Sequence, residues 1–268
     1  MNRDDIINLA EQYINNSPGN YIEKEAALHP GCVGMKIYDA PIFAFGAADD
    51  ELYVKYKSPG IIGGHFQGPA QWLPTAKTVI SFFLPYTQKI RTANATDNRW
   101  PADEWLHGRY EGQLLLKQLT EYLVKTISKT GHKAIAPSFD ERFKIGQENN
   151  PFTSNWSERH VAYACGLGTF GLSKGVITKK GMSGRFGSIL TEQNLPKDTR
   201  AYSGIYEYCT NCGKCINRCP ARAISENGKE SPICSSFMSK VMEKHSPRYG
   251  CGKCQVSVPC ESGIPVRK

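Results

Sequence analysis

The sequence predicts a mixed α/β (α+β) domain followed by a small cysteine-rich module. Two observations predict the domain: apolar residues recur at helical spacing in several segments, and a strongly β-prone run lies among them. A third predicts the module, because eight of the ten cysteines lie between Cys209 and Cys260. We place the boundary near residue 200, so that residues 1–200 form the α/β domain and residues 201–268 form the module.

Two helices are expected from hydrophobic periodicity. The first opens the chain, and the second runs from Arg109 to about Lys129 and ends at Gly131, a residue type that often terminates helices. The periodic positions are Ile6, Ile7, Ala10, Tyr13 and Ile14 in the first helix and Leu115, Leu119, Tyr122, Leu123 and Ile127 in the second.

The strands are expected in four short segments. Residues 78–84 form a strongly β-prone run that stops at Pro85, which indicates a buried strand. Residues 134–137 should form a short strand. Residues 176–178 and 186–191 should form two strands joined by the turn at 181–184. The Gly-, Pro- and aromatic-rich residues 30–72 are expected to hold short strands and loops.

A third helix is expected to begin at Asn155. Its side chain can cap the backbone while Glu158, three positions on, returns the bond. This helix should end at Gly166, where residues 166–171 spell the dinucleotide-binding pattern G-x-G-x-x-G. That pattern binds a pyrophosphate only where it follows a strand and opens a helix. Here the predicted helix comes first and a strand follows, so we expect no NAD site.

Composition argues against export and membrane insertion. No run of about 18 apolar residues occurs and no signal peptide opens the chain, so we expect a cytoplasmic protein with no membrane contact. The net charge of +8 is spread along the chain rather than gathered in one patch. A solvated surface explains it better than a nucleic-acid interface.

The cysteines of residues 209–220 fit C-x2-C-x2-C-x3-C-P. Three thiolates on one tight loop can hold three irons of a [4Fe–4S] cubane. The fourth is turned away and, in two-cluster ferredoxins, ligates the other cluster. Zinc sites instead draw their four ligands from two pairs. The motif therefore predicts iron–sulfur clusters in a ferredoxin-like module.

Eight thiolates are enough for two such clusters, whereas a single cluster with spare cysteines is the alternative. Cys260 lies five residues and a proline beyond Cys254, which departs from regular ferredoxin spacing. Cys32 and Cys165 are left over and are expected to be small buried groups. The predicted first set is Cys209, Cys212, Cys215 and Cys260, and the second is Cys219, Cys234, Cys251 and Cys254.

Over about residues 75–268 the chain resembles the epoxyqueuosine reductase family. The resemblance rests on residues 156–171, 176–178 and 187–191 together with the cysteine order, and it extends back through residues 108–110 and the strand before Pro85. These enzymes are cobalamin-dependent, carry two [4Fe–4S] clusters and are related to reductive dehalogenases. The resemblance implies a nitroreductase-like corrinoid-binding domain with the ferredoxin-like module packed against it.

The resemblance also implies site residues. The family's proton-donating aspartate lies six positions before the Glu-Arg pair, a position taken here by Phe152, and a phenyl ring cannot transfer a proton. Asp140, Glu141 or Tyr163 are the candidates to replace it. The implied corrin contacts are Ser173, Val176, Phe186 and Ser235, beside Gly168 and Gly171.

Three functions are consistent with these features. The favoured one is a corrinoid-dependent reductase, in which the clusters pass single electrons to a cobalamin that reduces a small-molecule substrate. A low-potential donor such as ferredoxin or flavodoxin would supply the electrons. The second is a non-catalytic [4Fe–4S] electron-transfer protein or a partner that reduces a corrinoid. The third is a tRNA epoxyqueuosine reductase, which is less favoured because the family's helical-repeat extension does not follow the clusters.

Overall fold

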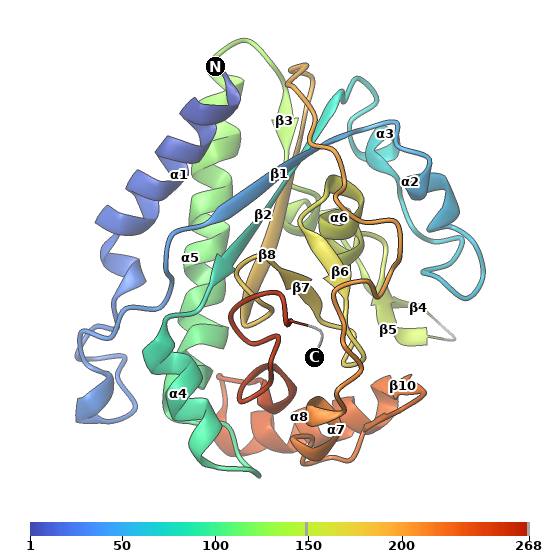
Figure 1. Ribbon diagram of the computed structural model, residues 1–268. Coiled ribbons are helices and arrows are strands. Elements are labelled where there is room, and N and C mark those ends of the chain that lie inside the picture. The colour runs from blue at the N-terminus through green and yellow to red at the C-terminus, as the bar shows by residue number, and fades with distance from the viewer. Residues whose placement is uncertain (148–149, 267–268) are drawn as a thin grey trace.

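The centre of the molecule is a four-stranded antiparallel sheet with the strand order β1-β2-β8-β3 (Figure 1). This computed structural model describes residues 1–147 and 150–266. The sheet combines with helices into the predicted mixed α/β (α+β) fold. Its strands are β1 (Ile42–Ala47), β2 (Thr78–Pro85), β8 (Gly184–Thr191) and β3 (Ala134–Ile135).

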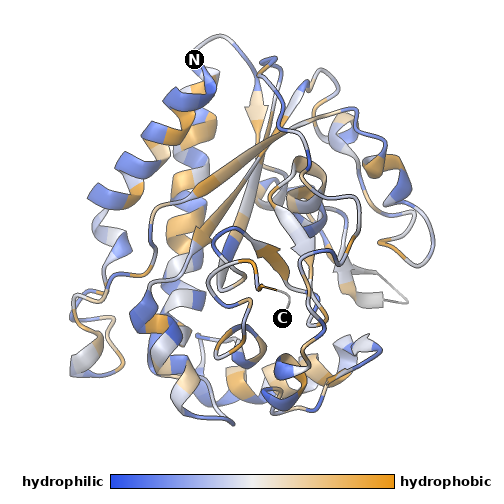
Figure 2. Ribbon diagram, in the orientation of Figure 1, coloured by the Kyte–Doolittle hydropathy of each residue, from blue (hydrophilic) through white to orange (hydrophobic). Residues whose placement is uncertain are grey.

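Helices cover both faces of the sheet. On one face α5 (Asp103–Ser128) packs against β8, with α1 (Arg3–Asn16) beside it, and on the other α6 (Glu158–Cys165) packs against β2 and β8. Every residue of β2 is buried, because alternate side chains enter two different cores. Figure 2 shows apolar residues concentrated on these strands and on α5. Burial on both faces explains why this strand has a continuous apolar sequence.

The helix predictions are correct in place and wrong in some of their ends. α1 lies where predicted, but α5 begins at Asp103, earlier than Arg109, because Trp105 and Leu106 continue its buried face. α6 begins at Glu158, and the capping box expected at Asn155 is wrong. The Asn155 side chain binds the backbone of an adjoining loop instead. Its amide donates to Arg142 O (2.9 Å), and its Oδ1 accepts from Lys144 N (2.9 Å).

The hairpin predicted for residues 176–191 does not form. β7 (Val176–Thr178) pairs with β6 (Gly168–Phe170), whereas β8 joins β2 and β3 in the central sheet. The turn at 181–184 instead contacts the C-terminal tail, where Met182 N donates to Cys260 O (3.1 Å). Because α6 precedes β6, the structure has the helix-then-strand order that argued against a dinucleotide site.

The remaining elements are short and surround this frame. Residues 30–72 contain β1 and two short helices among loops. No helix in the described part of the chain is long and apolar enough to cross a membrane. These short elements are α2 (Leu52–Lys55), α3 (Pro69–Trp72), α4 (Gln88–Thr96), β4 (Ile145–Gln147) and β5 (Asn150–Ser154).

The cysteine-rich segment packs beneath the sheet, against α4 and α5 (Figure 1). Asn94 on α4 donates to Cys251 O (3.1 Å), and the fully buried Lys253 Nζ donates to Asn94 O (2.9 Å). Gly252 lies so near Trp105 on α5 that an added Cβ would be 1.9 Å from the indole. The domain division at residue 200 stays a prediction. The elements of this segment are α7 (Lys214–Asn217), β9 (Ile224–Ser225), β10 (Gly228–Lys229) and α8 (Ser231–His245).

Candidate metal centre

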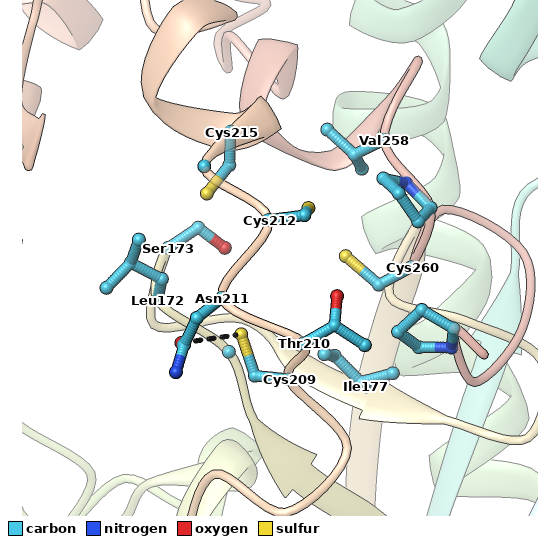
Figure 3. A pocket seen from close by; sticks show the side chains of 14 residues that line it. Leu172, Ser173, Ile177, Cys209, Thr210, Asn211, Cys212, Cys215, Val258 and Cys260 are labelled. Carbon is cyan, nitrogen blue, oxygen red and sulfur yellow. Dashed lines mark hydrogen bonds between the residues drawn. The ribbon is translucent and has the colours of Figure 1, made fainter. Parts of the chain in front are cut away.

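The four thiols of the first predicted set line a single pocket (Figure 3). Cys209 and Cys212 come from the loop that leads into α7, Cys215 lies in α7 itself, and Cys260 arrives from the C-terminal tail. Burial, together with the nearby thiols of Cys209 and Cys215, raises the pKa of Cys260 to about 12. Such mutual effects require neighbouring sulfurs, so the fold brings the tail to the C-x2-C-x2-C loop.

The four thiols of the second predicted set also gather at one place. Burial raises the pKa of Cys251 to about 12, and Cys254 and Cys234 add to the effect. Burial likewise raises the pKa of Cys254; nearby Lys229 opposes this rise, while Cys234 and Cys219 reinforce it. Cys219 thus faces away from the loop that carries it, and its sulfur accepts from Ala223 N (3.2 Å).

The two sets are neighbours. After burial, the largest cause that raises the pKa of Cys215, to about 11, is Cys254 of the other set. Electron transfer between redox centres needs such proximity. The eight thiols therefore lie near one another, and each predicted set combines cysteines from distant parts of the chain.

The spread of the sulfurs suits cubanes better than zinc. All ten cysteines are free, so none is consumed in a disulfide. Zinc–sulfur bonds of 2.3 Å in a tetrahedron would bring the sulfurs to about 3.8 Å from one another. Among the described residues, the one group of ligand atoms close enough to hold a single ion contains none of these eight thiols. A cubane holds its thiolates at separate iron corners and so needs this wider spacing.

Two cationic side chains beside the second set were missed by sequence reasoning. Lys229 of β10 hydrogen-bonds to Cys234, and Arg159 of α6 lies near Cys234 and Cys254. The Arg159 side chain is exposed, yet surrounding protein lowers its pKa by desolvation. Arg159 therefore lies at the surface beside the second set. Nothing in the sequence spacing could reveal these neighbours, because they come from separate elements.

The turn at residues 171–174 borders both sets, and it is where the resemblance implies a corrin. Gly171 and Ser173 line the pocket of the first set, and Ser173 is buried. The next residue, Lys174, accepts at its carbonyl from Arg159 Nη1 (2.6 Å) beside the second set. The turn therefore lies beside both sets of thiols.

The other implied corrin contacts are less favourably placed. Val176 is only 1 % exposed, in the core between the sheet and α6. Gly168 is needed for packing, because an added Cβ would lie 2.0 Å from the Ile177 carbonyl oxygen. Phe186 is half-buried on β8, with its ring centroid 4.6 Å from that of Phe83. Ser235 is half-buried on α8. Contacts of these four residues with a cofactor stay predictions.

Two of the three predicted proton donors, Asp140 and Tyr163, are held by other interactions. Asp140 pairs with Arg142 (2.7 Å), which lowers the pKa of Asp140 and keeps the carboxylate ionised at neutral pH. The Tyr163 hydroxyl donates to Ser203 O (3.4 Å), and burial raises its pKa. The ion pair disfavours Asp140 as an acid. A role for either residue stays a prediction.

Glu158, which sequence reasoning placed at the start of a helix and in the Glu-Arg pair of the resemblance, has the properties of a proton-holding carboxyl. Its Oε1 accepts from Ser138 Oγ (2.5 Å), and its Oε2 is buried. Burial raises the pKa of Glu158, and the nearby polar side chains only partly offset this. No salt bridge to Glu158 occurs within residues 1–147 and 150–266.

Comparisons with known proteins agree with the metal centre. Residues 203–225 match the 4Fe-4S binding domain family, which confirms the iron–sulfur prediction for the segment that carries the cysteine motif. Epoxyqueuosine reductase from Bacillus cereus is 25 % identical over 217 residues, which cover 73 % of this chain and 51 % of that protein. Tetrachloroethene reductive dehalogenase from Desulfitobacterium hafniense is 38 % identical over 114 residues, covering 40 % of this chain and 21 % of that one.

Solved structures of the same two groups share the fold. Epoxyqueuosine reductase from Streptococcus thermophilus aligns with a TM-score of 0.51 at 19 % identity, covering 84 % of this chain and 64 % of that one. The chain is epoxyqueuosine reductase-like. A catabolic reductive dehalogenase in complex with 3-bromo-4-hydroxybenzoic acid aligns with a TM-score of 0.55 at 15 % identity, covering 84 % and 30 %. The epoxyqueuosine reductase-like chain spans about half the length of the curated reductases it matches.

Proposed function

We propose that this chain is a reductase that uses two [4Fe–4S] clusters and a cobalamin. The observation that carries the proposal is the convergence of eight thiols into two adjacent sets beside the turn at residues 171–174. The related folds support it, since one reductive dehalogenase structure is described as suggesting a mechanism for B12-dependent dehalogenation. We propose that a ferredoxin or flavodoxin supplies the electrons.

The residues present fit both kinds of cofactor. The two thiolate sets would hold the clusters, and the turn at residues 171–174, whose Lys174 carbonyl accepts a hydrogen bond from Arg159, is the place we propose for a flat macrocycle. When bound, the clusters transfer single electrons and the cobalamin supplies a reducing cobalt centre. Lys229 and Arg159 place positive charge beside Cys234 and Cys254, and positive charge favours the reduced, more negative state of a cluster.

Within this function we assign Glu158 the task of holding a proton at Oε2. Reductive removal of an oxygen or halogen substituent consumes protons, so a reductase needs an acid that stays protonated near neutral pH. A desolvated carboxyl without a cation beside it meets this need, whereas Asp140 beside Arg142 does not. Phe152 lies at the position where related enzymes carry an aspartate, and Glu158 would take over its task.

Anaerobic purification with added cobalamin tests the proposal. We expect about eight irons and eight sulfides per chain, about one cobalt, and the absorption spectrum of a bound corrin. Eight irons without cobalt would support the second function, a [4Fe–4S] electron-transfer protein. A preparation that contains only zinc would contradict both.

The substrate divides the favoured function from a tRNA-modifying one. One epoxyqueuosine reductase of similar fold was solved with an epoxyqueuosine-modified tRNA stem loop, and this chain carries a net charge of +8. We favour a small molecule because no concentrated basic patch is evident in the sequence. If tRNA is the substrate, binding to a tRNA stem loop should weaken steeply as salt rises. Binding that does not respond to salt would support the small-molecule alternative.

A further inference from the structure

A second cluster of metal-ligating side chains lies outside the iron–sulfur centre. His29 and Cys32 come from the loop before β1, and Glu104 comes from the first turn of α5. One ligand atom from each lies within 4.8 Å of the other two. Cys32 Sγ is 3.3 Å from His29 Nε2, which is 3.6 Å from Glu104 Oε1. Cys32 is fully buried, whereas the His29 side chain is 41 % exposed.

We propose that His29, Cys32 and Glu104 bind a zinc ion whose fourth ligand is water. Tetrahedral zinc with bonds of about 2.0–2.3 Å places its ligand atoms about 3.3–3.8 Å apart, and both measured separations fall in this range. Sulfur, imidazole nitrogen and carboxylate oxygen are all established zinc donors. The exposed side of His29 leaves the site open to solvent, which provides the water.

The charges of this site balance. A thiolate and a carboxylate together neutralise a divalent cation, so no net charge is left in a partly buried place. Without metal, burial raises the pKa of Cys32 to about 11, and Glu104 and Asp103 raise it further. Zinc would displace this thiol proton, as metal binding to cysteine generally does.

The histidine must change its protonation to bind the ion. Gly31 N now donates to His29 Nδ1 (3.1 Å), which places the ring proton on Nε2 between Cys32 and Glu104. Coordination through Nε2 moves this proton to Nδ1 and releases the Gly31 amide. Gly31 is exposed, so its amide can bond to water instead. The competing interpretation is a metal-free hydrogen-bonded triangle, and the two differ in zinc content.

The site would hold the 26–32 loop against the start of α5. The same loop already contacts the next turn of α5, where Leu28 N donates to His107 Nε2 (3.1 Å). Zinc would thus add a second anchor at Glu104. Because its ligands are not among the eight clustered cysteines, this proposal is independent of the proposed reductase function.

Zinc analysis of the cluster-loaded full chain tests the proposal. The protein is prepared anaerobically, equilibrated with a slight excess of zinc sulfate, desalted, and analysed for zinc and iron by mass spectrometry. We expect about one zinc per chain with iron unchanged, and zinc-edge X-ray absorption that fits one sulfur with nitrogen and oxygen neighbours. Cys32→Ser and His29→Gln should each weaken zinc binding at least tenfold. Cys165→Ser, which changes the other buried cysteine outside the two predicted sets, should leave zinc binding unchanged.

Several results would overturn the assignment. These are a wild-type chain that retains no zinc, an absorption spectrum dominated by sulfur (zinc at the cluster cysteines), or equal zinc in wild type and both variants. If Cys32→Ser does not fold, His29→Gln decides alone, because the His29 side chain is partly exposed and its replacement leaves the core unchanged.

Discussion

Arg142 lies 2.7 Å from Asp140 and lowers the pKa of that carboxyl, whereas Glu158 has no such cation and its pKa is raised by burial. The two acids therefore respond to pH in opposite ways. The fold favours the charged form of Asp140 and the neutral form of Glu158. Only the neutral form can give up a proton, so residue environment rather than residue type separates a surface ion pair from a candidate acid.

This contrast predicts how stability depends on pH. A carboxyl with a raised folded-state pKa stabilises the protein fully below its unfolded pKa and loses that contribution as pH rises through its folded pKa. At pH 8 Glu158→Gln removes the cost of a buried charge, so we expect it to be more stable than wild type, by on the order of 1 kcal/mol. The difference should shrink toward pH 6, as followed by thermal unfolding of the cluster-loaded protein.

Asp140→Asn is the matched control for this measurement. The lowered pKa of Asp140 contributes stability to the wild-type protein above the unfolded pKa. The Asp140→Asn variant should therefore be slightly less stable than wild type between pH 6 and pH 8. The loss should be only about 0.5 kcal/mol, since the Arg142 side chain is 45 % exposed. A Glu158→Gln protein that loses more stability at pH 8 than at pH 6 would contradict the buried-acid assignment.

Cys212 offers a direct test of the first thiolate set. Cys212→Ala removes one of four cluster ligands at an exposed position, so it should leave the core intact. We expect iron to fall from about eight to about four per chain, because the second set keeps its own ligands. Iron and sulfide analysis with electron paramagnetic resonance checks this. Cys165→Ala should keep all the iron, and full iron in Cys212→Ala would contradict the two-set assignment.

At the scale of elements, strand pairing explains one glycine of the pattern that had suggested a cofactor motif. β6 and β7 approach so closely at Gly168 that no side chain fits, while Gly171 has more room, its nearest contact being the Ile177 side chain at 3.2 Å. Gly168 thus reflects a close two-stranded pair after α6.

The two glycines should tolerate alanine differently. Gly168→Ala pushes a Cβ into the rigid Ile177 carbonyl, so we expect a loss of about 2–4 kcal/mol in the free energy of unfolding. Gly171→Ala meets a flexible side-chain end, and its cost should stay below about 1 kcal/mol. Chemical denaturation of both variants measures this. Equal losses of unfolding free energy in the two variants would show that close β6–β7 packing is not the reason for a glycine at residue 168.

At the scale of the whole molecule, the cysteine-rich segment depends on the α/β domain for its position. Lys253 and Asn94 bond across the contact, and the backbone of Gly252 lies against Trp105 of α5. Cys251 and Cys254 flank this contact. Docking of the segment and assembly of the second set should therefore be coupled.

Gly252→Ala tests that coupling. Its Cβ would overlap the Trp105 indole, so we expect the segment to move off α5 and the protein to lose most of the iron of one cluster. Gly228→Ala is a suitable control, because Gly228 also has a positive φ (+109°) but nothing within 4 Å of its Cβ position. Iron analysis after desalting distinguishes the variants. Equal iron loss in both would attribute the effect to backbone strain rather than docking.

Much of this architecture was predictable from local pattern. The apolar period of α1 and α5 and the β-prone run of β2 identify these elements because burial repeats every few residues along the chain. The cysteine motif predicts cubanes for the same reason, since three ligands share one loop. Pairings at long range were not predictable, and the expected hairpin of β7 with β8 was wrong because both strands found better partners elsewhere.

By itself, the sequence determined the kind of metal centre and the main helices and strands, because these depend on residues close together in the chain. Only the tertiary structure decided that a cationic side chain lies near the thiols and that the Asn155 side chain bonds to a loop instead of capping a helix. It also decided that the Glu158 carboxyl is desolvated with no cation paired to it. It also brought His29 and Cys32 to Glu104. The physical reason is that desolvation and ligand geometry depend on what the whole fold packs around a group, which no local spacing records.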